Sequence, residues 1–363
     1  MNQPRFNETN MATEQPPPID GSQDASLPQL NDLMNQFCSF GDDCEFGVVQ
    51  RHAGADPIDL LRFAAMHVPH HQRIHALTDA ILRGFEGLGD AETLSCEPNP
   101  ALDQGKREFS IRESKYQLGY HTFRFEGDIS PERLCQEQVH VLRFWRRKFL
   151  DDLRAADKVC VWKTGGQHTE AEVRSLLAAT RKYGPNTLLW VDTAPPNEPI
   201  GVVQDLGDGL FKGSISRIGR FDRGPDVDYE SWFDLCDSAY RTLPMFRQAR
   251  LAASWQPAPD LSQYLGFVDG LIDDKLCGWC WRIGDATPVW LALYADGRRL
   301  ARFKANDHRE VRGHPLIDND QHGFYVALPL QTLAPRAVIS VRIMRTTFEL
   351  PGSSRALSDY PRP

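Results

Sequence analysis

The residue best suited to nucleophilic chemistry is Cys44, which follows the segment S-F-G-D-D at the start of a predicted helix that ends at Gly54. The first turn of a helix carries partial positive charge and unpaired backbone amides. Both favour the thiolate, the nucleophilic form of cysteine, and the amides can hold a developing oxyanion. The acidic neighbours Asp42, Asp43 and Glu45 act in the opposite direction and favour the protonated thiol. The alternative interpretation is a small buried thiol that packs the helix.

A cysteine nucleophile needs a base, and the best candidate is His121 in the run Y-H-T-F-R-F, whose alternation predicts a strand. Asp192, near the end of the apolar run T-L-L-W-V-D-T, is the candidate that orients the imidazole, since carboxylates at the carboxyl ends of strands often point into sites. Asn186 and Asp222 are weaker alternatives for that role. The predicted catalytic residues are therefore Cys44, His121 and Asp192, which must meet in the fold whatever their order along the chain.

Two further groups of residues match metal or redox motifs only in part. His71 and His75 lie one helical turn apart, but H-Q-R-I-H has Gln72 where a zinc protease has its general-base glutamate. Cys277 and Cys280 form a C-x-x-C motif inside a predicted strand, where their odd offset points them to opposite faces. A shared metal ion or a disulfide is then difficult. We therefore predict a solvated surface at the histidines, no metal site and no cofactor.

Length and composition limit the class of protein. The chain has 363 residues, which predicts two domains, and a formal net charge of −8, which disfavours general nucleic-acid binding. No apolar run approaches the roughly 20 residues that span a bilayer, and the N-terminus lacks the apolar core of a signal peptide. We therefore expect a cytoplasmic protein with free thiols among its eight cysteines. The expected partner is a peptide, amide or glycan substrate, without nucleic acid or a transmembrane segment.

Local signals place the elements that must position these residues. Ser130 and Pro131 predict a helix start, as N-cap and first helical residue. Thr169 and Glu172 predict a capping box. The second helix lies between apolar runs at 158–163 and 187–193, and this order predicts a parallel βαβ unit.

The C-terminal third of the chain has a different pattern. Several short alternating runs follow residue 264, and Asp296-Gly297 between two of them is a strong hairpin signal, so we expect a small all-β sandwich. The predicted fold class is α+β, with a mixed α/β domain before this sandwich. The predicted boundaries are a disordered tail at 1–28, an α+β domain at 29–250, a linker at 251–263, a β-sandwich at 264–350 and a flexible tail at 351–363.

The motif around Cys44 carries a family resemblance. S-F-G-D-D-C resembles the S-L-G-x-x-C signature of an uncharacterised bacterial family of papain-like cysteine peptidases. The runs A-D-P-I-D-L-L-R-F-A, Y-H-T-F-R-F, R-F-W-R-R-K-F-L-D-D-L and V-C-V-W-K-T resemble later segments of that family in the same order, over about 35–195. Leu61 stands where the family has an aromatic residue, and Thr122 where it has aspartate. The resemblance implies a papain-like fold with Cys44 as nucleophile and His121 as base, while Asp192 is assigned only by its strand position.

A second resemblance concerns the C-terminal third. The runs G-F-V-D-G-L-I-D-D-K-L-C-G-W-C-W and V-W-L-A-L-Y-A-D-G-R-R-L-A-R-F-K-A-N resemble the small β-domain appended to many bacterial glycosyltransferase-like proteins. It covers about 264–330 and implies a carbohydrate or surface-polysaccharide context. The expected function is a papain-like thiol hydrolase or transferase. The alternatives are a glycan-associated accessory or transferase protein without peptidase activity, and a catalytically inactive interaction scaffold.

Overall fold

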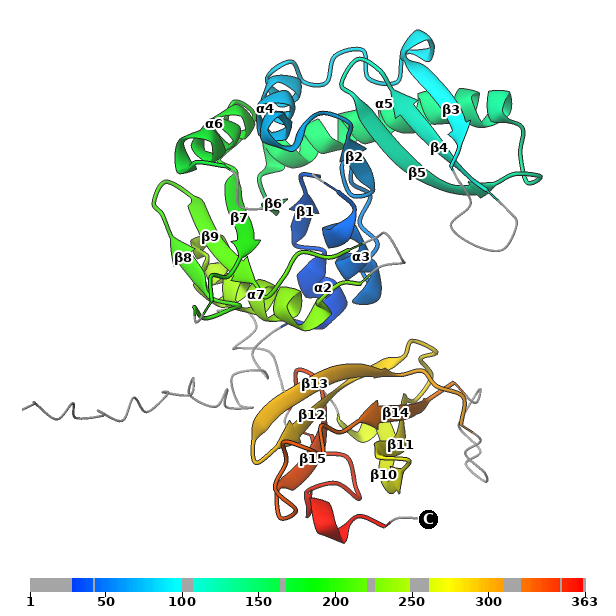
Figure 1. Cartoon of the computed structure of the whole chain (residues 1–363), viewed down its shortest axis with the longest axis vertical. Coiled ribbons are helices and arrows are strands. Elements are labelled where there is room, and N and C mark those ends of the chain that lie inside the picture. Colours follow the sequence, from blue (N-terminus) through cyan, green and yellow to red (C-terminus); the bar gives the residue numbers. More distant parts are fainter. Residues whose placement is uncertain are drawn as a thin grey trace, which may run out of the picture. The chain divides into compact units, whose positions relative to one another are not determined.

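The computed structural model describes residues 28–41, 43–99, 107–163, 168–196, 198–220, 226–248, 261–309, 321–346 and 348–361. The chain divides into two compact units, Leu27–Trp255 and a second unit that contains Gln256–Pro363. Each unit has its own sheets (Figure 1). Helices and several sheets are both present, so the predicted α+β class is confirmed. Most of the predicted N-terminal tail and linker, together with Asp42 and Asp222, lie outside the described residues.

A five-stranded, mostly parallel sheet organises one half of the unit Leu27–Trp255. Its order is β1-β6-β7-β9-β8, and only β8 runs antiparallel to its neighbour. The strands are β1 (Phe37–Ser39), β6 (Val159–Lys163), β7 (Thr187–Thr193), β8 (Val203–Asp205) and β9 (Leu210–Ile215). The predicted βαβ unit is confirmed, because β6 and β7 pair in parallel and α6 (Glu170–Arg181) lies between them in the chain.

A four-stranded antiparallel sheet forms the other half of this unit, in the order β2-β5-β4-β3. The strands are β2 (Ala64–Met66), β3 (Leu94–Pro98), β4 (Glu108–Glu113) and β5 (Leu118–Phe125). The short strand β2 pairs with residues 118–120 of β5 only, so the ladder ends just before His121. The remainder of β5 is therefore available to line a surface rather than the centre of a sheet.

The helices of this unit follow their local signals closely. They are α2 (Leu30–Met34), α3 (Glu45–His52), α4 (Arg73–Leu82), α5 (Pro131–Ala155), α6 and α7 (Tyr229–Thr242), with short 3₁₀ turns η1 (His70–Gln72), η2 (Ala91–Thr93) and η3 (Pro244–Phe246). As predicted, the Ser130 side chain caps α5 and Thr169 forms the capping box of α6. The long helix α5 lies against β3 and β4 (Figure 1). One difference concerns α3, which begins at Glu45, so that Cys44 is its N-cap residue and not part of its first turn.

The second unit consists of two antiparallel sheets, ordered β10-β11-β14 and β13-β12-β15-β16. Its elements are η4 (Leu261–Gln263), β10 (Tyr264–Ile272), β11 (Lys275–Arg282), β12 (Val289–Ala295), β13 (Arg298–Ala305), β14 (Gly323–Ala327), β15 (Val338–Ile343), β16 (Arg355–Ala356) and η5 (Leu357–Asp359). Buried residues of both sheets form one hydrophobic core. The predicted hairpin at Asp296-Gly297 joins β12 and β13, and both residues have positive φ, 49° and 78°.

The predicted flexible tail at 351–363 is wrong for the part that the structure describes. The carbonyl oxygens of Pro351 and Pro361 accept the N–H groups of Val268 and Leu271 on β10, at 2.8 and 2.9 Å. Tyr360 is buried, and its hydroxyl donates to a backbone oxygen of β15 at 2.9 Å. The segment is ordered because it satisfies the outer edge of β10, which the composition of the tail does not reveal.

Candidate functional site

Cys44 lies at the start of α3 with a half-buried thiol. Its side chain makes no capping hydrogen bond to the first turn of α3. Burial raises the pKa of Cys44 to about 11, the charge of Asp43 adds to this, and Lys163 opposes it. The thiol is therefore protonated at neutral pH, and the helix start does not by itself produce a thiolate.

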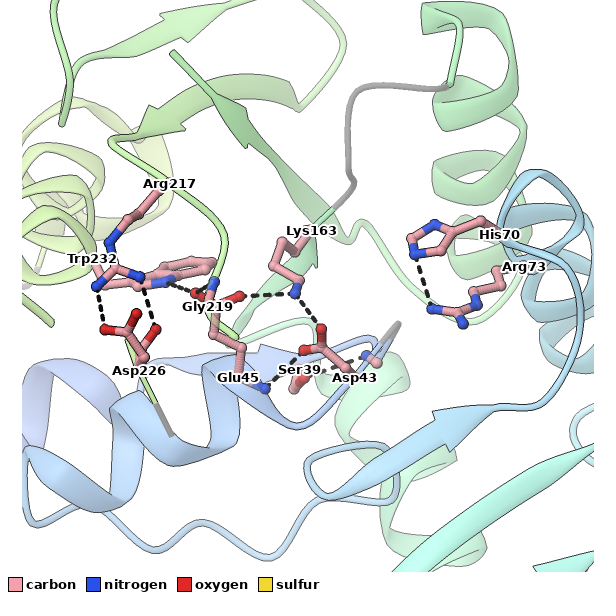
Figure 2. A network of polar contacts seen from close by, with 11 residues as sticks. Ser39, Asp43, Glu45, His70, Arg73, Lys163, Arg217, Gly219, Asp226 and Trp232 are labelled. Carbon is pink, nitrogen blue, oxygen red and sulfur yellow. Dashed lines mark hydrogen bonds and ion pairs between the residues drawn. The ribbon is translucent and has the colours of Figure 1, made fainter. Parts of the chain in front are cut away.

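A buried ion-pair network fixes the backbone on both sides of Cys44 (Figure 2). Lys163, at the end of β6, donates to Asp43 at 2.5 Å and to Glu45 at 2.8 Å. The other oxygen of Glu45 accepts the N–H of Gly219 at 2.9 Å and the indole N–H of Trp232 at 3.0 Å. Glu45 is fully buried and Lys163 nearly so. Three segments far apart in the sequence therefore converge on one carboxylate beside Cys44.

The two carboxylates of this network favour the charged form of Lys163. Burial alone would lower the pKa of Lys163, but the charges of Asp43 and Glu45 raise it overall. Sequence reasoning missed this network, although a lysine that ends the otherwise apolar strand V-C-V-W-K is a signal for a buried cation with an acidic partner. The network positions the start of α3, and the effect of Lys163 on the pKa of Cys44 is smaller than the opposite effects of burial and Asp43.

His121 forms a pair with Glu108, a residue that sequence reasoning missed. The imidazole Nδ1 lies 3.0 Å from Glu108 Oε2, and Glu108 Oε1 accepts the N–H of Phe123 at 2.8 Å. The hydrogen bond to Glu108 raises the pKa of His121 above its ordinary value, against the effect of burial. Burial would raise the pKa of Glu108, but its hydrogen bonds to His121 and Phe123 lower it overall. The carboxylate therefore orients the ring and leaves Nε2 without a hydrogen bond among the described residues.

A pocket of about 350 Å³ opens beside this pair. That volume is at the lower end of the roughly 300–1,000 Å³ found for small-molecule sites. Its walls are Arg51 of α3, residues 56–59 and 62–63 of the following loop, residues 120–123 of β5, and Gln138, Val141 and Trp145 on one face of α5. The pairing of β2 with β5 ends at Tyr120, so residues 121–123 line the pocket without a β2 partner.

The structure does not join the predicted catalytic residues to one another. Within the described residues, no hydrogen bond links Cys44, His121 and Asp192. Asp192 lies at the end of β7, in the other sheet, and its carboxylate accepts the N–H of Thr193 at 2.8 Å. The position that we predicted for Asp192, on the imidazole of His121, is taken by Glu108. Asn186 is buried, and its amide donates to backbone oxygens of Leu153, Thr180 and Gly184, which is a structural role.

The loop residue Phe63 lies against both α3 and β5. The Phe63 carbonyl accepts the N–H of His121 at 3.4 Å. Gly47 lies one turn after Cys44, and a Cβ atom there would be 3.0 Å from the Phe63 ring. Phe63 lines the pocket, whereas Cys44 does not. The segment at Phe63 therefore contacts both β5 and α3.

The remaining motifs have structural surroundings. His75 Nε2 lies 3.0 Å from Glu172 on an exposed helix surface. On β11, Cys280 belongs to the hydrophobic core while the Cys277 thiol donates to the carbonyl of Gly270, so the two thiols face opposite sides. The described ranges contain no group of three or more histidine, cysteine or acidic residues arranged to hold a metal ion. In the same ranges, no helix is long and apolar enough to cross a membrane.

Comparisons of this chain with known proteins find no match. No protein family model matches the chain, and no match is found among curated proteins or solved structures. The two family resemblances therefore stay predictions from short motifs.

We expect the Cys44 thiol to alkylate slowly, because its pKa of about 11 leaves little thiolate at neutral pH. The rate should be roughly 100-fold below that of a thiol with an ordinary pKa, and should rise steadily up to pH 10. Iodoacetamide labelling followed by peptide mass spectrometry measures the rate, with the urea-unfolded chain as the reference for the same cysteine. A labelling rate that is already constant between pH 7 and 9 would contradict the protonated thiol.

Proposed function

We propose that the unit Leu27–Trp255 is a hydrolase or transferase in which His121 is the acid–base group. The observation that carries the proposal is the contact between His121 Nδ1 and Glu108 at 3.0 Å, with the ring on the wall of a pocket. A carboxylate on one ring nitrogen fixes the tautomer and directs the other nitrogen to a reacting group. Acid–base groups with shifted pKa values beside a pocket are typical of catalytic sites.

In the proposed reaction, His121 first accepts a proton from the attacking group and then gives a proton to the leaving group. Neutral His121 accepts at Nε2 the proton of the attacking group, as that group forms its bond to the electrophilic atom of the substrate. Glu108 stabilises the imidazolium that results. The imidazolium then gives the proton to the leaving group as the second bond breaks. The cycle returns His121 to its neutral form and needs no other reactant when the attacking group is water.

The nucleophile is the part of the proposal that the test must assign. Cys44 is a candidate because of its place before α3 and the family resemblance, but its thiol is protonated and does not line the pocket. Water or an acceptor hydroxyl in the pocket is the other candidate. Replacement of Cys44 by Ala separates the two, because it abolishes turnover only if the thiol attacks.

The proposal is tested by a panel of p-nitrophenyl esters, thioesters and peptide anilides at a range of pH. The rate should rise with pH through the pKa of His121, above its ordinary value of 6.5, because only the neutral ring is a base. Replacing Glu108 by Gln removes the charge that raises this pKa, so the rising limb should move to lower pH and the rate should fall.

His75→Gln is the matched control, since His75 also contacts a glutamate but lies on an exposed helix. It should leave both the rate and the pH profile unchanged. A Glu108→Gln profile that coincides with that of the unmodified protein would remove His121 from the mechanism.

A further inference from the structure

The pocket beside His121 has an apolar wall on one helix. Val141 and Trp145 lie one turn apart on α5, with Gln138 a turn earlier on the same face. Ile58 lies in the loop that lines the pocket and is 48 % exposed. An exposed isoleucine beside a half-buried tryptophan is a surface that an apolar ligand can cover. This wall fits the body of a small hydrophobic group.

Arg51 gives the same pocket a positive charge that no described residue neutralises. Its guanidinium carbon lies 4.4 Å from the ring centre of Phe63 and 4.5 Å from that of Phe123. The two rings contact the guanidinium, and Arg51 as a whole residue is exposed. Arg51 forms no ion pair with the described residues. It is therefore a cation in the lining of the pocket, held against two aromatic rings.

The carboxylates near the pocket are already engaged. Asp56 forms an ion pair with Arg62, Glu108 pairs with His121, and Asp59 accepts the N–H of Ser39 at 2.8 Å. Burial raises the pKa of Asp59 to about 6, so part of its charge is lost near neutral pH. Arg51 is thus a pocket-lining cation that none of these carboxylates engages in an ion pair.

A buried hydroxyl in the pocket wall also has no partner. Tyr120 lines the pocket and is 3 % exposed, and its hydroxyl has no hydrogen bond among the described residues. An unpaired buried hydroxyl costs free energy unless a ligand or a water satisfies it. Burial also raises the pKa of Tyr120 well above its ordinary value, so the group is a donor and not an anion.

We infer that the pocket binds a small amphipathic anion, with a carboxylate or phosphate head at Arg51 and an apolar body against Val141 and Trp145. This inference rests on the proposed function, because it names the substrate class of the same site. Binding of the anionic head by Arg51 sets how far the substrate enters the pocket. The apolar body of the substrate then extends along α5. The bond to be cleaved or formed lies between the two, within reach of His121.

Binding of three probes to the full chain tests this inference by calorimetry. The probes are 4-phenylbutyrate, its neutral isostere 4-phenylbutyramide, and phenyl phosphate. At least one of the two anions should bind in the millimolar range or better, and the amide should bind about 10- to 100-fold more weakly. Whether the carboxylate or the phosphate binds more tightly identifies the head group.

Variants of Arg51 test whether this residue binds the anionic head of the ligand. Arg51→Gln should lower the affinity for the anion about 10- to 100-fold and leave the amide unchanged, whereas Arg51→Lys should keep most of the anion binding. Arg83→Gln is the matched control, because Arg83 is an exposed arginine after α4 and does not line the pocket. Equal binding of anion and amide, the absence of binding by both anions, or equal effects of Arg51→Gln and Arg83→Gln would overturn the inference.

The binding experiment separates this inference from the proposed function. Anion binding that depends on Arg51, in a protein whose turnover does not depend on His121, keeps the ligand class and removes the acid–base role. Turnover that depends on His121 without a preference for anionic substrates removes the ligand class and keeps the acid–base role.

Discussion

Replacing Lys163 by Met should lower the free energy of unfolding by about 3–5 kcal/mol, since removal of one partner of a buried ion pair leaves the other charge buried and unpaired. Glu45 is fully buried, and only Lys163 provides a positive charge to it among the described residues. The N–H groups of Gly219 and Trp232 would remain as its hydrogen-bond donors. Those neutral donors cannot replace the lost charge, so the whole decrease in the free energy of unfolding should be observed. Urea unfolding monitored by tryptophan fluorescence measures it.

Lys148→Met is the matched control for this substitution. Lys148 pairs with Asp152 on α5, its side chain is 30 % exposed, and Asp152 keeps a second partner in Lys158. The cost there should stay near about 1 kcal/mol, because this pair is only partly buried and Asp152 keeps Lys158 as a counter-charge. Adding Glu45→Gln to Lys163→Met should recover part of the lost stability, because it removes the unpaired charge. Equal costs for Lys163→Met and Lys148→Met would contradict a buried network beside Cys44.

His121→Gln should lower kcat by about 10²- to 10⁴-fold on any substrate of the panel, the usual contribution of a positioned acid–base group. Glutamine has a similar size and can keep a hydrogen bond to Glu108, but it cannot take up and release a proton at neutral pH. KM should change little, because the pocket walls on α5 and Arg51 are untouched. Steady-state kinetics at a pH above the pKa of His121 measures both constants.

Two measurements separate catalysis from folding in this variant. The midpoint of thermal unfolding should stay close to that of the unmodified protein, because the His121 side chain is 40 % exposed. The rising limb of the pH profile, which belongs to the ring, should disappear. A loss of less than tenfold in kcat with the pH profile intact would rule out His121 as the base.

Local chemistry made several elements predictable from the sequence. Ser130 with Pro131, Thr169 with Glu172, and Asp296-Gly297 each act within a few residues, and each appears in the structure at the predicted place. Hydrophobic periodicity likewise located the parallel unit of β6, α6 and β7. The papain-like arrangement and the carbohydrate context of the second unit stay predictions, because short motifs alone carry them.

The candidate site was predictable only in part, because it depends on contacts between distant residues. His121 could be selected by residue type and strand context, but its partner Glu108 depends on the register of β4 and β5. Asp192 has the right position on its strand, yet that strand belongs to the other sheet. The sequence could not show which carboxylate reaches the imidazole, since pairing between strands decides it.

The sequence by itself determined where helices and turns begin, which residue types could act, and that helices and sheets would combine. Caps, turn residues and periodicity act over a few residues, so their effect can be recognised without a fold. Only the tertiary structure decided that Cys44 is protonated, that Lys163 is held by Asp43 and Glu45, and that His121 faces a pocket with Arg51. Burial and charge depend on which distant segments meet, and local sequence does not specify that meeting.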